Sequence, residues 1–272
     1  MSFRTFLYAP AHRMKFVRSA LSTQPPCDAV ILDLEDGVPS DERENAFINL
    51  AELAAESVPA RPVFIRIRSL TDEQEEDLQA VPSWTAGIVV TKVGGPEDLV
   101  RAASHARALS ANCQVWPLIE SALGIEALPE ILRETRELIG GVMLGAGDLR
   151  ADLEVSATPN ETELLYARSR LVYVCRSQGI SHIIDTPDPE LRPSEQFIER
   201  TKAAKSLGMT GKAAIHPAQI EVIRSVFSPT ADQISWARAV LAAEDGATRV
   251  DGELVDEATK RRARGILSEA HE

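Results

Sequence analysis

Residues 29–43 read AVILDLEDGVPSDER, and this stretch contains one complete strand-to-helix transition. The run Ala29–Leu34 is apolar except for Asp33 and includes β-branched residues, which favours a buried strand. An acidic turn then ends at Gly37, and Ser40 with the acids that follow it provides a cap residue and a negative first turn for a helix. A strand, a polar turn and a helix in this order predict one unit of a parallel α/β sheet.

The same transition recurs along most of the chain. The other candidate strands are Thr5–Ala9, Val63–Ile67, Gly87–Thr91, Gln114–Ile119, Gly141–Leu144, His182–Ile184 and Ala213–Ile215. Together with the first run they make about eight, the number that closes a TIM (β/α)8 barrel, so we predict an α/β protein with this barrel in residues 1–228. An open doubly wound sheet has the same periodicity, but no Gly-x-Gly-x-x-Gly follows the first strand.

Residues 229–272 exceed what closure of a barrel requires. Helical patterns are expected over Thr230–Ala243 and Asp256–Glu269. We therefore predict a C-terminal helical extension that acts as a lid or as an oligomer contact.

The length and net charge of the chain limit the classes of binding partner that we expect. The chain has 272 residues, with 29 Lys and Arg against 41 Asp and Glu, which gives a net charge of −12. This balance argues against nucleic acid and anionic membranes as partners, because both normally require a basic surface. The three Cys are isolated from one another, and no stretch approaches the ~20 apolar residues of a membrane span, so we expect a cytoplasmic protein.

Each candidate strand delivers a polar or charged residue at its carboxyl end, where α/β barrels hold their active sites. Glu120 and Asp148 follow neighbouring strands, and a pair of carboxylates suits Mg²⁺, which prefers oxygen ligands. A Mg²⁺ ion held there could chelate a 2-oxo acid and stabilise an enolate. Each carboxylate could equally cap the helix that follows it, so the spacing leaves both interpretations open.

Arg66 is a charged residue in an otherwise apolar strand, Val63–Ile67. An arginine that points into the mouth of a barrel requires an anion, and its planar guanidinium matches a carboxylate in two-pronged fashion. That carboxylate could belong to a substrate or to a structural partner such as Asp33 or Glu35.

Further cations follow the first and fourth strands. Arg13 and Lys15 have no acid beside them, which suits the phosphate groups of a ligand and equally suits a solvated helical turn. Lys92 ends the fourth strand, and a surface charge is its simplest interpretation.

Six motifs occur in an order that resembles a known family. They are LDLEDGV (32–38), Arg66, PLIESALG (117–124), GAGDL (145–149), IDTP (184–187) and GKAAIHPAQ (211–219). Together they resemble the citrate lyase β-subunit-like family, within the Mg²⁺-dependent aldolase and lyase superfamily that includes malyl-CoA lyases. The resemblance covers nearly the whole chain, from Arg4 to the C-terminal segments around Trp236 and Asp256.

The resemblance implies a homotrimeric or hexameric TIM barrel that binds an oxo acid and an acyl-CoA. Such an enzyme cleaves or forms a 3-hydroxyacyl-CoA, such as malyl-CoA or citramalyl-CoA, through a metal-stabilised enolate of a 2-oxo acid. Two alternatives stay open. One is a metal-dependent aldolase that acts on a free hydroxy-oxo acid without CoA, and the other is a β-subunit that is active only within a larger lyase complex.

The resemblance also implies a role for individual residues. The implied residues are Glu120 and Asp148 for Mg²⁺, Arg66, Glu120, Arg13 and Lys15 for the substrate, and Glu35, Asp36 and Asp256 for catalysis. Within this set, Arg66 would hold the carboxylate of the oxo acid, and Glu35 and Asp36 would shape the water shell of the metal. Asp256 would be an acid/base that the extension brings to a neighbouring subunit.

Three positions depart from the family pattern. Gly147 stands where many relatives have Glu, Gly94 stands where they have the Glu of a Pro-Lys-x-Glu motif, and Arg68 stands where they have Asn. The missing carboxylate at Gly147 would loosen control of the metal's waters, and Arg68 would add positive charge near the acid-binding wall. The departures leave the metal pair in place and put the choice of substrate in question.

Overall fold

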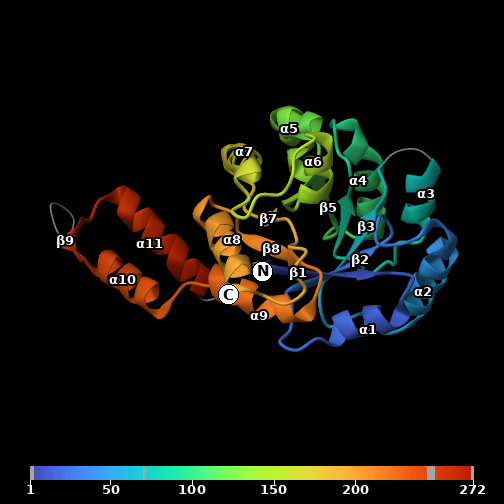
Figure 1. The fold of residues 1–272 in the computed structure, drawn as a ribbon, viewed down its shortest axis with the longest axis horizontal. Coiled ribbons are helices and arrows are strands. Elements are labelled where there is room, and N and C mark those ends of the chain that lie inside the picture. The colour runs from blue at the N-terminus through green and yellow to red at the C-terminus, as the bar shows by residue number, and fades with distance from the viewer. Residues whose placement is uncertain (1–2, 70–71, 244–248, 271–272) are drawn as a thin grey trace.

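A closed barrel of eight parallel strands forms the centre of the computed structural model, which describes residues 3–69, 72–243 and 249–270 (Figure 1). The strands are β1 (Thr5–Pro10), β2 (Ala29–Asp33), β3 (Val63–Ile67), β4 (Gly87–Val90), β5 (Gln114–Ile119), β6 (Val142–Leu144), β7 (Ile183–Asp185) and β8 (Gly211–Ala214). Strand β1 pairs with both β2 and β8, which closes the ring. The predicted TIM barrel is confirmed.

Helices cover the outer surface of the barrel, because parallel neighbours can only be joined by connections that cross outside the sheet. These helices are α1 (Met14–Ser22), α2 (Arg43–Ala55), α3 (Asp72–Gln79), α4 (Glu97–Leu109), α5 (Ala122–Thr135), α6 (Ala146–Asp152), α7 (Leu165–Ser177), α8 (Glu195–Ser206) and α9 (Ile220–Phe227). None of the helices in the described part of the chain is both long and apolar enough to span a lipid bilayer.

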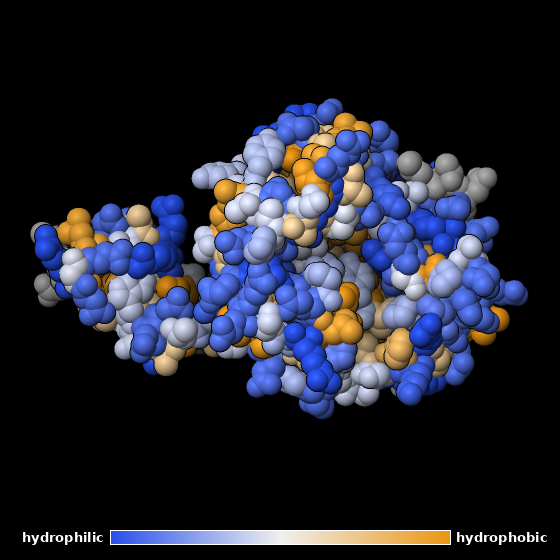
Figure 2. Space-filling view, in the orientation of Figure 1, coloured by the Kyte–Doolittle hydropathy of each residue, from blue (hydrophilic) through white to orange (hydrophobic). Residues whose placement is uncertain are grey.

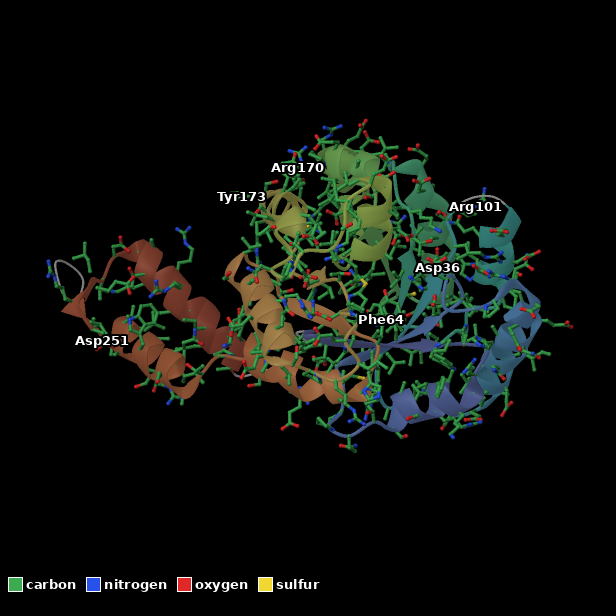
Figure 3. All side chains as sticks on the ribbon, viewed as in Figure 1. Asp36, Phe64, Arg101, Arg170, Tyr173 and Asp251 are labelled. Atoms are coloured by element: carbon green, nitrogen blue, oxygen red, sulfur yellow. The ribbon has the colours of Figure 1, made fainter. Side chains whose placement is uncertain are left out.

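Side chains on the strands alternate between the helices and the interior of the barrel. Leu32 and Ile65 belong to the large core between strands and helices. Phe6, Phe64 and Trp116 face inward, and their ring centroids lie 5.2 to 5.3 Å apart, so they form an aromatic plug inside the barrel. Figure 3 labels Phe64 at the centre of the barrel. The plug therefore fills the interior of the barrel at this level.

The C-terminal extension projects from the barrel as a separate pair of helices (Figure 1). Helices α10 (Ala231–Ala242) and α11 (Glu257–Ala270) lie side by side, with the short strands β9 (Arg249–Val250) and β10 (Glu253–Leu254) between them in the sequence. Ala237, Val240, Val255 and Ala263 form a small core of their own. Figure 2 shows this largely hydrophilic unit joined to the barrel by a narrow waist. The predicted helical extension is present, and its role as lid or oligomer contact stays a prediction.

The last two strands differ from the predicted boundaries by one to two residues. Asp185 lies within β7 and Lys212 within β8, although both are charged and fully buried. Lys212 Nζ is 2.7 Å from Asp185 Oδ2, so each charge supplies the partner that the other needs inside the protein. The pattern of apolar residues does not show this pairing.

Candidate active site

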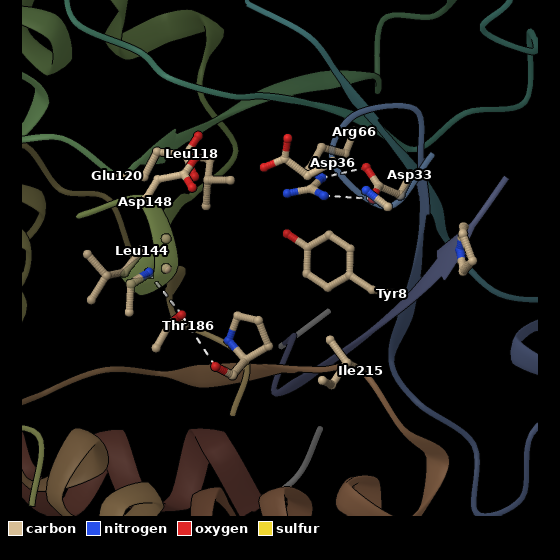
Figure 4. A pocket seen from close by; sticks show the side chains of 16 residues that line it. Tyr8, Asp33, Asp36, Arg66, Leu118, Glu120, Leu144, Asp148, Thr186 and Ile215 are labelled. Atoms are coloured by element: carbon tan, nitrogen blue, oxygen red, sulfur yellow. Dashed lines mark hydrogen bonds and ion pairs between the residues drawn. The ribbon is translucent and has the colours of Figure 1, made fainter. Parts of the chain in front are cut away.

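A cavity of about 420 Å³ opens at the carboxyl ends of the barrel strands (Figure 4). It is lined by Tyr8, Pro10, Asp33, Asp36, Gly37, Arg66, Leu118, Glu120, Leu144, Gly145, Ala146, Gly147, Asp148, Thr186, Pro187 and Ile215. Asp36, Arg66, Glu120 and Asp148 are among the residues predicted from the sequence. The structure therefore brings the predicted metal pair and the predicted carboxylate-binding arginine into one cavity.

Acidic side chains cluster at this cavity, where Asp36, Glu120 and Asp148 line the wall and Glu35 lies beside them. Oxygen atoms of Glu35, Asp36 and Asp148 lie within 4.8 Å of one another. Glu120 follows β5, is only 5% exposed and projects beside Asp148 (Figure 4). One of its oxygens, Oε1, accepts the backbone N–H of Lys92 at 2.7 Å. So dense a group of acids is costly unless a cation joins it.

Neither member of the predicted metal pair caps a helix. Ser121 Oγ accepts the N–H of Gly124 and caps α5, directly after Glu120. Gly145 is the N-cap of α6, and Asp148 lies within the first turn of that helix. The interpretation of these two carboxylates as simple helix caps is therefore wrong.

The electrostatics of the acids fit a divalent cation. Burial, together with the charges of Asp148 and Glu35, raises the pKa of Glu120 to about 8. Burial and the charge of Glu35 also raise the pKa of Asp36. A bound divalent cation would relieve this repulsion, and carboxylate oxygens are the ligands that Mg²⁺ prefers. The residues present thus fit a Mg²⁺ ion.

Arg66 reaches the cavity from β3 and is held in place by acids. Its Nε and Nη2 lie 2.6 Å from Asp33 Oδ1 and Oδ2, and its Nη1 lies 3.2 Å from Glu35 Oε2. Asp33 also accepts the backbone N–H groups of Glu35 and Gly37, so the acidic turn after β2 folds around its carboxylate. Both structural partners considered from the sequence are present, and Arg66 nevertheless lines the cavity.

Lys92 lies beside the acids but lines a separate hollow and not the cavity itself. Its Nζ lies 2.8 Å from Glu35 Oε1, and this contact raises the pKa of Lys92. Its backbone adopts a φ of 52°, in the left-handed region, while its N–H points to Glu120. The Lys92 side chain is 52% exposed, so it is a surface charge, as the sequence indicates, and one that is paired with Glu35.

Four predicted site residues do not line the cavity. Glu35 lies beside Asp36 and Asp148 but lines a separate hollow, and the other three are Arg13, Lys15 and Asp256. Arg13 and Lys15 are exposed, and neither lines the cavity. Asp256 lies in the extension, where its Oδ1 accepts the N–H and the hydroxyl of Thr259 at 2.7 and 2.9 Å at the start of α11. Within a single chain, Asp256 is therefore not part of the cavity, because the extension projects away from the barrel mouth.

The three departures from the family pattern have different surroundings. Gly147 lines the cavity, and a Cβ atom built on it meets nothing within 4 Å, so there is room for the missing carboxylate. Arg68 is paired with Asp77 at 3.0 and 2.7 Å and lines a separate hollow, so it does not add free positive charge at the cavity as expected. Gly94 donates its N–H to Asp98 at 2.7 Å.

Several residues of the cavity wall were not selected from the sequence. Tyr8, Leu118, Thr186 and Ile215 each lie two positions beyond a residue of the inward-facing core, namely Phe6, Trp116, Ile184 and Ala213. Side chains two positions apart on a strand point to the same side of the barrel. This alternation, followed along each strand and just past its end, predicts that these four residues line the cavity.

Several known proteins are similar to this chain in sequence and in fold. The family model described as HpcH/HpaI aldolase/citrate lyase matches residues 4–217. The chain belongs to this family. A citrate lyase subunit beta-like protein of Deinococcus radiodurans is 30% identical over 278 residues, which cover 97% of this chain and 96% of the relative. The mitochondrial citramalyl-CoA lyase of Rattus norvegicus is 27% identical over 97% of this chain and 85% of its own.

A solved structure of an HpcH/HpaI aldolase/citrate lyase relative matches the whole chain. Protein CitE from Mycobacterium tuberculosis, in complex with magnesium, acetoacetate and coenzyme A, superposes with a TM-score of 0.80 at 28% identity. The match covers 100% of this chain and 99% of CitE, so it includes both barrel and extension. The family resemblance drawn from the six motifs is confirmed.

Proposed function

We propose that the chain is a Mg²⁺-dependent carbon–carbon lyase that cleaves or forms a 3-hydroxyacyl-CoA such as malyl-CoA or citramalyl-CoA. The observation that carries the proposal is the convergence of Asp36, Glu120 and Asp148 on the cavity that Arg66 lines, with Glu35 in contact with Arg66 beside them. Two relatives support the substrate class, since one is named for citramalyl-CoA and the other was solved with magnesium and coenzyme A.

In this proposal two of the acids bind the metal directly and two act through its water molecules. Glu120 and Asp148 would be its protein ligands, and Glu35 and Asp36 would orient its water molecules. When bound, Mg²⁺ supplies a Lewis acid that polarises the oxygens of a 2-oxo acid. Arg66 orients the oxo acid through its carboxylate.

The bond changes of the cleavage balance without a further reactant. The 3-hydroxyl loses its proton and becomes a carbonyl, the adjacent C–C bond breaks, and the electron pair of that bond passes to the α-carbon of the thioester. That carbon then takes up a proton. The enolate therefore develops on the acyl-CoA fragment, whereas the oxo-acid enolate expected from the sequence belongs to the aldolase alternative.

Residues outside the cavity complete the proposal. We infer that Asp256 exchanges the proton in the cavity of a neighbouring copy within a homotrimer or hexamer, because the extension that carries it projects away from its own barrel (Figure 2). Arg13 and Lys15 lie just beyond the carboxyl end of β1, at the same end of the barrel as the cavity, and there they bind the phosphate groups of CoA.

Exchange of protons with D₂O tests which fragment carries the enolate. With Mg²⁺ and an oxo acid, the proposed lyase should exchange the methyl protons of acetyl-CoA, as followed by NMR. Exchange of the methyl protons of pyruvate in the absence of CoA would contradict the proposal and identify a free-acid aldolase. An inactive isolated protein that gains activity only with stoichiometric partner subunits would identify a dependent β-subunit instead.

A further inference from the structure

The hydroxyl of Tyr8 is a hydrogen-bond donor at the cavity that has no role in the proposed reaction. Tyr8 faces inward from β1 and lines the cavity. Its ring packs against the aromatic plug on one side, and on another the guanidinium Cζ of Arg66 lies 5.1 Å from the ring centroid. Figure 4 shows the hydroxyl end of Tyr8 turned into the cavity, toward the side from which Glu120 and Asp148 project.

The Tyr8 hydroxyl lacks a hydrogen-bond partner within the described part of the chain. Among the residues that the structure describes it makes no hydrogen bond, and its only specific contact is the one between its ring and Arg66. Burial raises the pKa of this phenol above its ordinary value, so the hydroxyl keeps its proton at neutral pH. A partly buried phenol of this kind normally finds a polar partner, and here the open space in front of it is the cavity.

The other side-chain donors around the cavity are already engaged. Arg66 uses Nε and Nη2 on Asp33 and Nη1 on Glu35. Lys92 Nζ contacts Glu35 as well, and the Thr186 hydroxyl bonds within its own loop at 3.4 Å. A carboxylate that enters beside Arg66 therefore meets a guanidinium whose charge is shared with two acids, and one free hydroxyl.

We propose that the Tyr8 hydroxyl donates a hydrogen bond to the carboxylate of the 2-oxo acid that binds beside Arg66. This inference rests on the proposed function, which supplies the oxo acid as ligand. Tyr8 is then a substrate-binding residue whose neutral donor compensates for the acids that already occupy Arg66.

The same surroundings define the class of oxo acid. Arg66 is the only cation among the described residues that line the cavity. The rest of the wall includes the apolar side chains of Leu118, Leu144 and Ile215. Beyond the proposed Mg²⁺, a second carboxylate would have no cationic side chain to meet there, so the site fits a monocarboxylic 2-oxo acid such as pyruvate or glyoxylate better than a dicarboxylic one such as oxaloacetate.

Tyr8→Phe isolates the contribution of the hydroxyl, because it leaves the ring in place. Calorimetric titration of pyruvate into the Mg²⁺-loaded protein should show a Kd raised about tenfold, the effect of one hydrogen bond to a charged group. The Kd of acetyl-CoA and the Tm should stay unchanged. Tyr173→Phe is the matched control, since Tyr173 on α7 is 78% exposed and lies outside the cavity. Equal pyruvate affinity in Tyr8→Phe and wild type would overturn the inference.

A second measurement covers a Tyr8→Phe variant that does not fold. The chain labelled with 3-fluorotyrosine keeps the shape of the side chain, and the ¹⁹F resonance assigned to position 8 should shift when pyruvate is added with Mg²⁺. An unchanged resonance at saturating pyruvate would refute the contact.

The inference and the proposed function can fail separately. If the wild-type protein binds pyruvate through Tyr8 and cleaves no acyl-CoA, only the proposed function fails. If it cleaves acyl-CoA and Tyr8→Phe binds pyruvate normally, only the inference fails. Absence of binding of both pyruvate and glyoxylate by the wild-type protein with Mg²⁺ overturns both.

Discussion

Replacing Lys212 with Met should destabilise the fold and weaken the metal site at the same time. Lys212 is fully buried, and its Nζ lies 2.7 Å from Asp185 Oδ2 and 2.8 Å from the carbonyl oxygen of Thr186. Arg168 holds the same Asp185 carboxylate with Nε at 2.8 Å and Nη2 at 3.0 Å. The Met side chain fills a similar volume without the charge, so the variant reports on the ion pair.

This buried network is connected to the helix that carries the predicted metal ligand Asp148. At the start of α6, the N–H of Ala146 donates to Thr186 Oγ1 at 3.0 Å. Near the other end of α6, Arg150 Nη2 lies 3.0 Å from Glu161, which in turn lies 2.6 Å from Arg168. Both ends of the helix are therefore tied to the charges around Asp185.

The expected loss of unfolding free energy follows from the burial of the Lys212–Asp185 ion pair. Loss of one partner from a buried ion pair costs about 3–5 kcal/mol, and we expect the lower end because Asp185 keeps Arg168. Urea unfolding at pH 7 measures the loss, and Asp185→Asn completes a double-mutant cycle. The double variant should lose less than the sum of the two single variants. Lys202→Met is the matched control and should be nearly neutral, because its pair with Glu199 is exposed.

The same pair predicts a sensitivity to acid. Burial alone would raise the pKa of Asp185, but the charges of Lys212 and Arg168 outweigh burial and hold that pKa below its ordinary value. The resulting stability is present above the ordinary pKa of an Asp, about 4, and is lost as the pH falls below it. Lys212→Met should reduce this loss. If the variant loses less than about 1 kcal/mol, shows additive effects and binds Mg²⁺ normally, the reasoning about this network is wrong.

Three further predictions concern the cavity and the extension. Arg66→Lys should raise the KM for the oxo acid about tenfold in steady-state assays, because one ammonium cannot reproduce the fork that meets a carboxylate, and an unchanged KM would count against the assigned role. Gly147→Glu should fold normally and bind Mg²⁺ more tightly by calorimetry, because its side chain enters open space, whereas Gly145→Ala should destabilise the protein because its Cβ would lie 2.7 Å from the Cβ of Glu120. A chain that ends at residue 228 should keep a cooperative thermal transition and lose both activity and, by analytical ultracentrifugation, its oligomeric state; an active truncated monomer would contradict the role given to the extension.

Much of the barrel follows from the sequence, because its strands are short apolar runs separated by helical patterns. Asp185 and Lys212 break this rule at β7 and β8, since a charged residue is predicted outside a buried strand. Their burial depends on each other and on Arg168, which lies on a helix. Sequence spacing cannot show that such residues meet, so the boundaries of the last two strands were misplaced.

The candidate site was predictable where residue type and strand end agree. Asp148 and Arg66 were found because charged residues at the carboxyl ends of barrel strands indicate an active site. The sequence does not indicate Tyr8 as a site residue, because an aromatic residue within a strand is typical of the core. Only the structure shows that Tyr8 lines the cavity, where its hydroxyl can contact a ligand. The location of Asp256 depends on how the extension packs, which no local pattern specifies.

Cleavage of purified acyl-CoA thioesters by the isolated protein is the measurement that tests the proposed function most directly. Malyl-CoA and citramalyl-CoA are supplied with Mg²⁺, and the oxo acid and acetyl-CoA released are quantified together. We expect the two products to appear in equal amounts, EDTA to abolish the reaction and Mg²⁺ to restore it, and Asp148→Asn to remove most of the activity. Turnover that persists in EDTA, or release of free CoA without an oxo acid, would contradict it.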